Sequence, residues 1–167
     1  FHEKINKLYF SVVWSTILEL RLEISLKNFL TQPYSSDHRL QFQHSSSGGA
    51  DGYNVKQSAV KIHKAHDITI SDCEFSHVGM IGLWVGYSSR TSISNSVFFD
   101  IGYHGIKTTG GKGKSPRIYE DILISNNLLN GCGIAHFWTA SCIWADGDKK
   151  ITISNNEATN VPNNGIK

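Results

Sequence analysis

Two tryptophans and two lysines recur where the sequence could build a binding surface. Trp84, Lys107, Trp144 and Lys167 each follow directly after an aliphatic residue in one repeated pattern. If those aliphatic residues face a core, strand alternation turns the four outward in one row, with a spacing of about 4.8 Å between parallel strands. Large exposed aromatics usually mark a binding surface. Indoles can stack on sugar rings and ammonium groups can bind hydroxyls or uronate carboxylates, so the row predicts carbohydrate binding. The alternative is that inserted loops cover the tryptophans and that they merely pack.

Candidate catalytic groups flank this row. Asp146 follows two residues after Trp144 on the same outward side, and His104 belongs to a second outward row made of Ile81, His104, Ser141 and Asn164. A third row, one corner earlier, contains His77, Asp100, Gly131 and Asn160. Asp100, His104, Lys107 and Asp146 are therefore expected to converge on one cleft.

Two carboxylates on either side of a glycosidic bond can serve as acid and as base or nucleophile. Two simpler interpretations stay open: Asp100 caps a corner turn, and His104 is an ordinary exposed turn residue. His77 and Lys167 complete the candidate substrate contacts. Trp138 lies in an aromatic-rich insertion, 136–139, which forms either a wall of the cleft or a shield for the core edge.

The architecture follows from an internal repeat. One aliphatic column contains Ile70, Ile93, Ile124 and Ile153, at steps of 23, 31 and 29 residues. A second contains Leu83, Ile106, Ile143 and Ile166, at steps of 23, 37 and 23. The basic coil is thus about 23 residues, and longer steps are coils with inserted loops. Period-2 alternation excludes helical repeats.

The corners of the coils carry their own pattern. Asp72, Asn95, Asn126 and Asn155 follow the first strand of each coil, and glycines mark two later corners, Gly79, Gly102 and Gly133 at one and Gly82, Gly105 and Gly165 at the other. Asn and Asp tolerate left-handed backbone, and stacked Asn side chains can form a hydrogen-bonded ladder. The glycines predict positive φ or close backbone approach. The fold class is therefore all-β, a single-stranded right-handed parallel β-helix.

The amino-terminal third is less regular. Residues 1–37 are expected to be an irregular segment with a strand or an incomplete first coil, and 38–167 to be β-helix repeats that stop in mid-pattern. Residues 18–29, 38–43 and 58–63 predict strands, whereas 45–54 and 109–120 predict loops. Residues 8–18 loosely resemble the apolar region of a signal peptide, but a buried strand explains them more simply.

Composition narrows the function. The chain has 167 residues, 18% of them charged, and a net charge of +2, which lacks the dense basic footprint of nucleic-acid binding. No apolar run is long enough to span a bilayer. No CxxC or HExxH motif occurs, and too few carboxylates converge for calcium, so neither metal nor cofactor is expected. Three cysteines leave two alternatives, a bridge between Cys132 and Cys142 or buried free thiols.

Residues 57–90 and 95–107 resemble the right-handed β-helix repeat proteins of the pectate-lyase superfamily, and most closely relatives of glycoside hydrolase family 141. Those proteins carry runs similar to the one from His77 to Trp84 and to the Asp-x-Gly-x-x-Gly-Ile run that begins at Asp100. The resemblance covers roughly 38–167. It implies a secreted enzyme that acts on polysaccharides through acidic residues. The family pattern favours an acid near Asn160, so the chain departs from it there.

Three functions remain open. The leading hypothesis is a glycoside hydrolase that uses Asp100 and Asp146. A polysaccharide lyase or uronate C5-epimerase would instead use Lys107 to neutralise the uronate and His104 to abstract the C5 proton. The third is a non-catalytic β-helix that binds glycans or acts as a scaffold.

Overall fold

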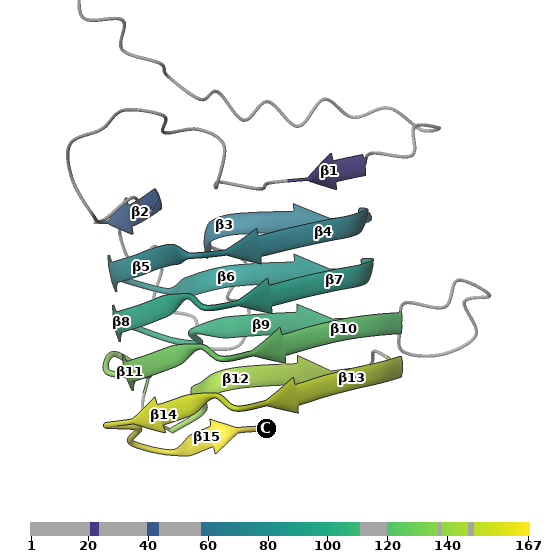
Figure 1. Cartoon of the computed structure of the whole chain (residues 1–167). Coiled ribbons are helices and arrows are strands. Elements are labelled where there is room, and N and C mark those ends of the chain that lie inside the picture. Colours follow the sequence, from purple (N-terminus) through teal and green to yellow (C-terminus); the bar gives the residue numbers. More distant parts are fainter. Residues whose placement is uncertain (1–20, 24–39, 44–57, 111–119, 137, 147–148) are drawn as a thin grey trace, which may run out of the picture.

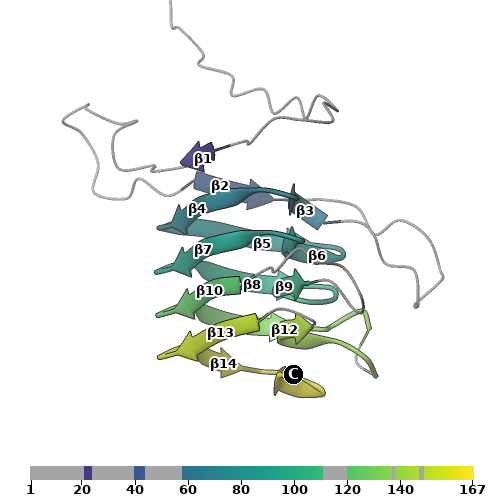
Figure 2. The same ribbon diagram turned by 90° about the vertical axis from the view of Figure 1, so that its right-hand side faces the viewer.

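The computed structural model describes residues 21–23, 40–43, 58–110, 120–136, 138–146 and 149–167. These residues form three parallel five-stranded sheets that wind into a right-handed β-helix (Figure 1). Each coil contributes one strand to each sheet. Turned by 90°, the coils lie one above another as regular layers (Figure 2). The predicted fold class is confirmed.

The three sheets share one connectivity, in which a strand of sheet C leads into sheet A and then into sheet B. Sheet A contains β1 (Arg21–Glu23), β4 (His66–Ser71), β7 (Ser89–Ser94), β10 (Glu120–Ser125) and β13 (Lys149–Ser154). Sheet B contains β2 (Leu40–Gln43), β5 (Cys73–Val78), β8 (Val97–Ile101), β11 (Leu128–Cys132) and β14 (Glu157–Thr159). Sheet C contains β3 (Ser58–His63), β6 (Ile81–Gly86), β9 (Ile106–Thr109), β12 (Ser141–Asp146) and β15 (Asn164–Ile166).

The two aliphatic columns expected from the repeat are in register. In sheet A, Ile93 pairs with Ile70 on one side and Ile124 on the other, and Ile153 follows. In sheet C, Leu83, Ile106, Ile143 and Ile166 pair in the same way. Most of these side chains are completely buried, whereas Ile166 in the last strand is half exposed. Sheet B adds an aromatic pair, Phe75 and Phe98, stacked at 4.6 Å between ring centroids. The core therefore runs along the axis as stacked columns.

The corner between sheets A and B is made by left-handed residues. Asp72, Asn95, Asn126 and Asn155 have φ between 52° and 56°. Their predicted role in the turn is thus confirmed, because Asn and Asp adopt this backbone more easily than other non-glycine residues. The hydrogen-bonded ladder, however, is formed by the residues one position later.

That buried ladder contains Ser96, Asn127 and Asn156. The Nδ2 group of Asn127 donates to Oδ1 of Asn156 at 2.9 Å and to the carbonyl of Ile93 at 3.0 Å. Its Oδ1 accepts the backbone N–H of Ser96 at 3.0 Å. The expectation that Asn126 and Asn155 form the ladder was wrong by one residue. The left-handed turn points the first side chain outward and the next one inward.

The glycine corners owe their composition mainly to close approach. A Cβ added to Gly102 would lie 2.0 Å from the carbonyl oxygen of Gly79 in the coil before. Only Gly131 and Gly133 among the described glycines have positive φ. Close backbone stacking, rather than left-handed conformation, therefore requires glycine at Gly102.

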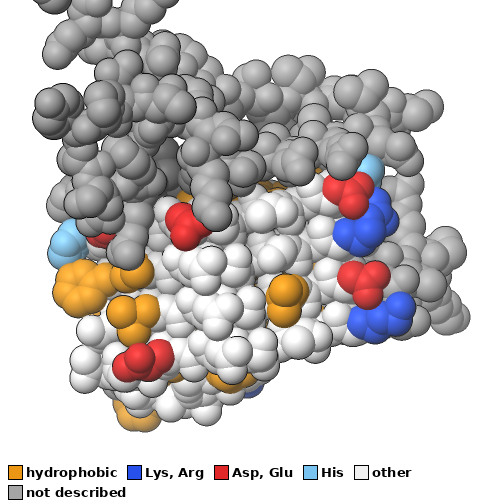
Figure 3. Space-filling view, viewed as in Figure 1, with side chains coloured by type: hydrophobic (Ala, Val, Ile, Leu, Met, Phe, Trp, Pro, Cys, Tyr) orange, Lys and Arg blue, Asp and Glu red, His pale blue; other side chains and the backbone are white. Residues whose placement is uncertain are grey.

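Charged side chains alternate along the start of the sheet A strands. Asp67, Arg90, Asp121 and Lys150 occupy one column, visible as acidic and basic groups in turn along one edge of the molecule (Figure 3). Arg90 donates to both carboxylate oxygens of Asp67, at 2.6 and 2.8 Å, and Lys150 lies 3.8 Å from Asp121. The Arg90 guanidinium holds the pKa of Asp67 well below its usual range. In this column each acidic side chain is paired with a basic side chain of the next coil.

Several expectations fall partly outside the described residues. Strands occur at 21–23, 40–43 and 58–63 as predicted, while 1–20, 45–54 and 111–119 lie outside the described part. Cys132 and Cys142 are buried free thiols, which was one of the two alternatives. In the part of the chain that the structure describes, no helix is long and apolar enough to cross a membrane.

Candidate functional site

The outward row of sheet C is built by strand register. Trp84 of β6 pairs with Lys107 of β9, and Lys107 pairs with Trp144 of β12. Lys167 is held beside Trp144 by two backbone hydrogen bonds, since its N–H donates to the Ile143 carbonyl and its carbonyl accepts the Ala145 N–H. Lys61 of β3 pairs with Trp84 and extends the row by one coil. We call Lys61, Trp84, Lys107, Trp144 and Lys167 the lysine–tryptophan row.

Sequence reasoning missed Lys61, although the signal was present. Lys61 precedes Trp84 by one 23-residue coil, the same step that separates Trp84 from Lys107.

Ammonium groups lie over the indole rings of this row. Lys61 Nζ is 4.0 Å from the ring centroid of Trp84, and Lys107 Nζ is 5.2 Å from it. Lys167 Nζ is 4.5 Å from the ring of Trp144. Lys61 and Lys107 belong to the coils on either side of Trp84. Cation–π attraction of this kind links neighbouring coils. A sugar that stacks on Trp84 would compete with these lysines for the ring.

Polar groups lie beside the row at the carboxyl ends of β9 and β12. The Trp84 Nε1–H donates to Thr109 Oγ1 at 2.9 Å, and Asp146 pairs in register with Thr109. Lys107 is partly buried between the two indoles. Burial lowers its pKa below the ordinary value, and the negative charge of Asp146 opposes this shift without cancelling it. The charges of Lys107 and Asp146 therefore act on one another.

His104 lies under the row instead of in a cleft. Its side chain is 1% exposed, and its ring contacts those of Tyr103 and Trp144 at centroid distances of 4.0 and 5.0 Å. Nδ1 lies 3.1 Å from the Ser141 N–H and 3.3 Å from the Ser141 carbonyl oxygen, so Ser141 offers this ring nitrogen both a donor and an acceptor. Burial first, and then the charge of Lys107, lower its pKa to about 3. The interpretation as an exposed turn residue was wrong, because the ring is buried.

The aromatic-rich insertion that contains His136 and Trp138 packs close to His104. His136 packs edge-on against Tyr103 at 5.2 Å, and Ala140 is buried with Tyr103 and Ile81. Trp138 is 79% exposed, and its backbone carbonyl accepts a hydrogen bond from Asn163 Nδ2 at 2.7 Å. The insertion thus packs against Tyr103, whose ring in turn contacts that of His104.

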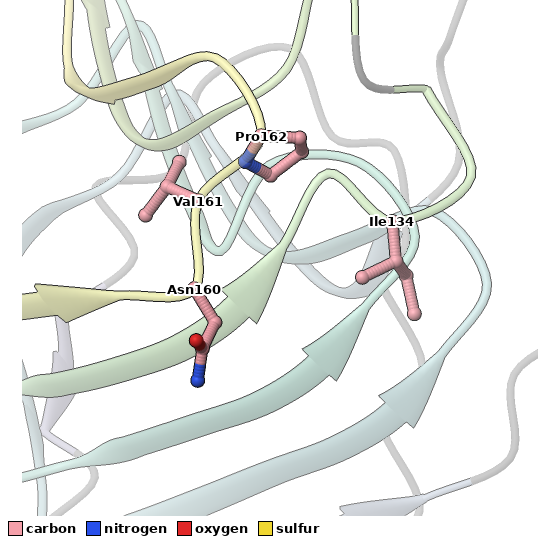
Figure 4. A pocket seen from close by; sticks show the side chains of 4 residues that line it. All are labelled: Ile134, Asn160, Val161 and Pro162. Carbon is pink, nitrogen blue, oxygen red and sulfur yellow. The ribbon is translucent and has the colours of Figure 1, made fainter.

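An open depression lies beside the insertion. Ile134, Asn160, Val161 and Pro162 line it, and their side chains surround a shallow space at the corner between sheets B and C (Figure 4). Asn160 Nδ2 donates to Asn130 Oδ1 at 2.7 Å, away from sheet C. No acidic residue lines the depression, so it offers no group for acid–base chemistry.

His77 and Asp100 form a pair on a different face. The Nδ1 atom of His77 is 2.6 Å from Oδ2 of Asp100, and the His77 ring packs edge-on against Phe99. Both residues have positive φ at the corner that ends sheet B. Asp100 therefore lies near the end of β8 with left-handed backbone and bonds to His77 of the coil before.

Asp100 and Asp146 are not brought together. Asp100 belongs to β8 of sheet B, whereas Asp146 ends β12 of sheet C, at the end far from the corner that joins the two sheets. Asp146 pairs with Thr109, the last residue of β9, whereas Asp100 precedes the first residue of β9. The length of β9 therefore adds about 10 Å to the separation of the two carboxylates. Paired carboxylates of glycosidases are roughly 5–10 Å apart. Of the four groups expected to converge on one cleft, Lys107 and Asp146 lie near each other on sheet C. His104 is buried beneath the lysine–tryptophan row, and Asp100 lies elsewhere.

No group of three or more His, Cys, Asp or Glu side chains that could hold a metal ion occurs among the described residues.

Comparison with known proteins identifies the repeat. Residues 42–167 match the protein family described as "Right handed beta helix region". Neither a curated protein nor a solved structure matched the chain. The match covers most of the chain and agrees with the three parallel sheets. It supports the β-helix repeat and gives no support to the finer likeness to glycoside hydrolase family 141.

Proposed function

Since the chain belongs to the family of right-handed β-helix regions, whose coils repeat each outward position at one strand spacing, we propose that it is a carbohydrate-active protein that binds a polysaccharide along sheet C. The observation that carries this proposal is the lysine–tryptophan row, five in-register residues from five consecutive coils. A linear polymer that lies along the helix axis would meet the same kind of contact at every coil.

The chemistry of the row suits a glycan. Partly buried indoles provide apolar surface, and ammonium groups donate to hydroxyl or acidic oxygens. Thr109 and Asp146, beside the row, add a hydroxyl and a carboxylate. A surface that combines aromatic rings with several polar groups is typical of carbohydrate sites and unusual on a sheet face that only packs or faces water.

Hydrolysis, the activity that the family 141 resemblance implies, would use Asp146, the one expected carboxylate that lies beside the row. Its partner would have to be a group other than Asp100, which lies on another face with His77. The geometry therefore supports binding more strongly than a two-carboxylate mechanism.

A second candidate is β-elimination from a uronate. The lowered pKa of Lys107 favours a neutral amine, which is the form that can accept a proton. The amine would take the C5 proton, the C4–O bond would break, and the leaving oxygen would take a proton from water. His104, which is buried beneath the row, would pack against Trp144 instead of serving as the base.

Retention in native gels that contain dissolved polysaccharides tests the proposal. We expect Trp84→Ala and Trp144→Ala to lose retention, while Leu123→Ala, an exposed apolar residue of sheet A, keeps it. Equal retention of all three variants would contradict binding on sheet C. Ultraviolet absorbance of unsaturated products would identify elimination, and new reducing ends without that absorbance would identify hydrolysis.

A further inference from the structure

The charges of the lysine–tryptophan row alternate with its rings. Lys61, Lys107 and Lys167 come from every second coil, and Trp84 and Trp144 come from the coils between them. At the spacing of parallel strands, the backbones of successive lysines are about 10 Å apart along the axis. A ligand that follows the row therefore meets a lysine, an indole, a lysine, an indole and a lysine.

The lysines of the row also contact its indole rings. Ammonium groups lie 4.0 Å and 5.2 Å from the centroid of the Trp84 ring, and one lies 4.5 Å from that of Trp144. Lys61 and Lys167 are exposed, so their remaining N–H groups can reach an outside acceptor. The recognition that the row offers is thus a pattern of positive charge with apolar intervals.

Among the described residues of this face, the lysines of the row outnumber the acidic groups beside them. The neighbouring outward row of sheet C contains His63, Gly86, Thr109 and Asp146, and Asp146 is its one acidic member. Three lysines against one aspartate leave a net positive strip. Lys107, the central lysine, is partly buried, so an anion that contacts it is shielded from water and bound more firmly than one at a surface lysine.

Resting on the proposed function, we infer that the polysaccharide is acidic and carries its anionic group on every second sugar. A sugar in an extended β-linked chain advances by about the separation of neighbouring strands, so two sugars match two coils. Anions on alternate sugars would each face a lysine, and the sugars between them would lie against the indoles. A polymer with a carboxylate on every sugar would present more carboxylates along the row than the row has lysines.

Three polymers test the need for negative charge and the need for its alternation separately. Hyaluronan carries a carboxylate on every second sugar, polygalacturonate carries one on every sugar, and xylan without side groups carries none. We expect hyaluronan to bind most tightly by calorimetry, and its affinity to fall as salt is raised from about 0.05 M to about 0.5 M, because salt screens exposed charges.

Charge-removing variants locate the site. Lys107→Gln should weaken hyaluronan binding by about tenfold, the loss of one charge-assisted contact in a partly buried place. Lys61→Gln, at an exposed position that cannot disturb the core, should weaken it by a smaller factor. The control Lys150→Gln makes the same charge change on sheet A and should leave binding unchanged.

Each outcome decides one point. Tighter binding of polygalacturonate would overturn the alternation, and equal, salt-independent binding of xylan would overturn the requirement for charge, while both leave polysaccharide binding in place. If none of the polymers binds, the proposed function itself fails. Equal losses in Lys61→Gln and Lys150→Gln would overturn the assignment to the row.

Discussion

Acid should destabilise this protein through His104, and the sign follows from burial. The groups that face the ring are Tyr103, Trp144, the Ser141 backbone and two lysines, Lys107 and Lys167, and burial lowers its pKa from 6.5 to about 3. Below pH 6.5 the unfolded chain therefore binds a proton at His104 that the folded chain does not. Folding stability rises with pH wherever the unfolded state binds more protons. The loss should begin as pH falls through 6.5 and be complete near 3.

The magnitude follows from the two pKa values. At pH 7.5 the group contributes almost nothing, because the ring is neutral in both states. At pH 5 the unfolded chain is favoured by RT ln(1 + 10^1.5), which is about 2 kcal/mol. That amount is a large fraction of the stability of a typical domain.

Urea unfolding of the native protein and of His104→Asn, at pH 7.5 and pH 5, measures this effect. Asn places an amide oxygen near the position of Nδ1, so the Ser141 N–H keeps an acceptor while the titrating group is gone. The variant should be less stable at pH 7.5 because it leaves a cavity, but it should lose about 2 kcal/mol less than the native protein on going to pH 5. Parallel losses in both proteins, or a native His104 that titrates near 6.5 by NMR, would refute the reasoning.

Two further predictions concern the ladder and the thiols. Asn127→Ala leaves the Ser96 N–H and the Ile93 carbonyl without partners in the core, and urea unfolding should show a loss of about 2–5 kcal/mol, whereas Asn126→Gly, at φ 56° on the outside, should change stability by less than about 1 kcal/mol. All three cysteines are buried, and burial raises the pKa of Cys73 to about 11, so none should react with iodoacetamide at pH 8 until the protein is unfolded. Rapid labelling of the folded protein would contradict that burial.

The fold was predictable because each inward column repeats the same physical demand. Ile70 and its successors must fill one core position in every coil, so their period survives inserted loops. The ladder was less predictable because two coils each contain two consecutive Asn residues at the corner, Asn126 and Asn127 in one and Asn155 and Asn156 in the next. The sequence does not say which of Asn126 and Asn127 points inward. Backbone handedness at the first residue decides this, and it is visible only in the structure.

The site was predictable along a strand and less so across a corner. Alternation placed Trp84, Lys107 and Trp144 in one outward row, since neighbours in register need no tertiary information. The burial of His104 depends on an insertion that folds back over Tyr103, which no local pattern encodes. Asp100 and Asp146 lie in neighbouring coils, but a coil has three faces, and nearness in coil number does not give a shared face.

The alternation of the lysine–tryptophan row is not a requirement of the fold. A β-helix constrains its inward columns, whereas outward rows are free to vary, as Thr69, Ser92, Leu123 and Thr152 do in sheet A. Lysine over indole does stabilise neighbouring coils, by about 0.5–1 kcal/mol for each partly exposed contact. Stability alone, however, would be served as well by aliphatic side chains in this row, which bury apolar surface without the cost of partly burying Lys107. The row keeps a desolvated cation at its centre and exposed cations two coils away on either side, an arrangement that costs stability when empty and gains free energy when anions with the same spacing occupy it.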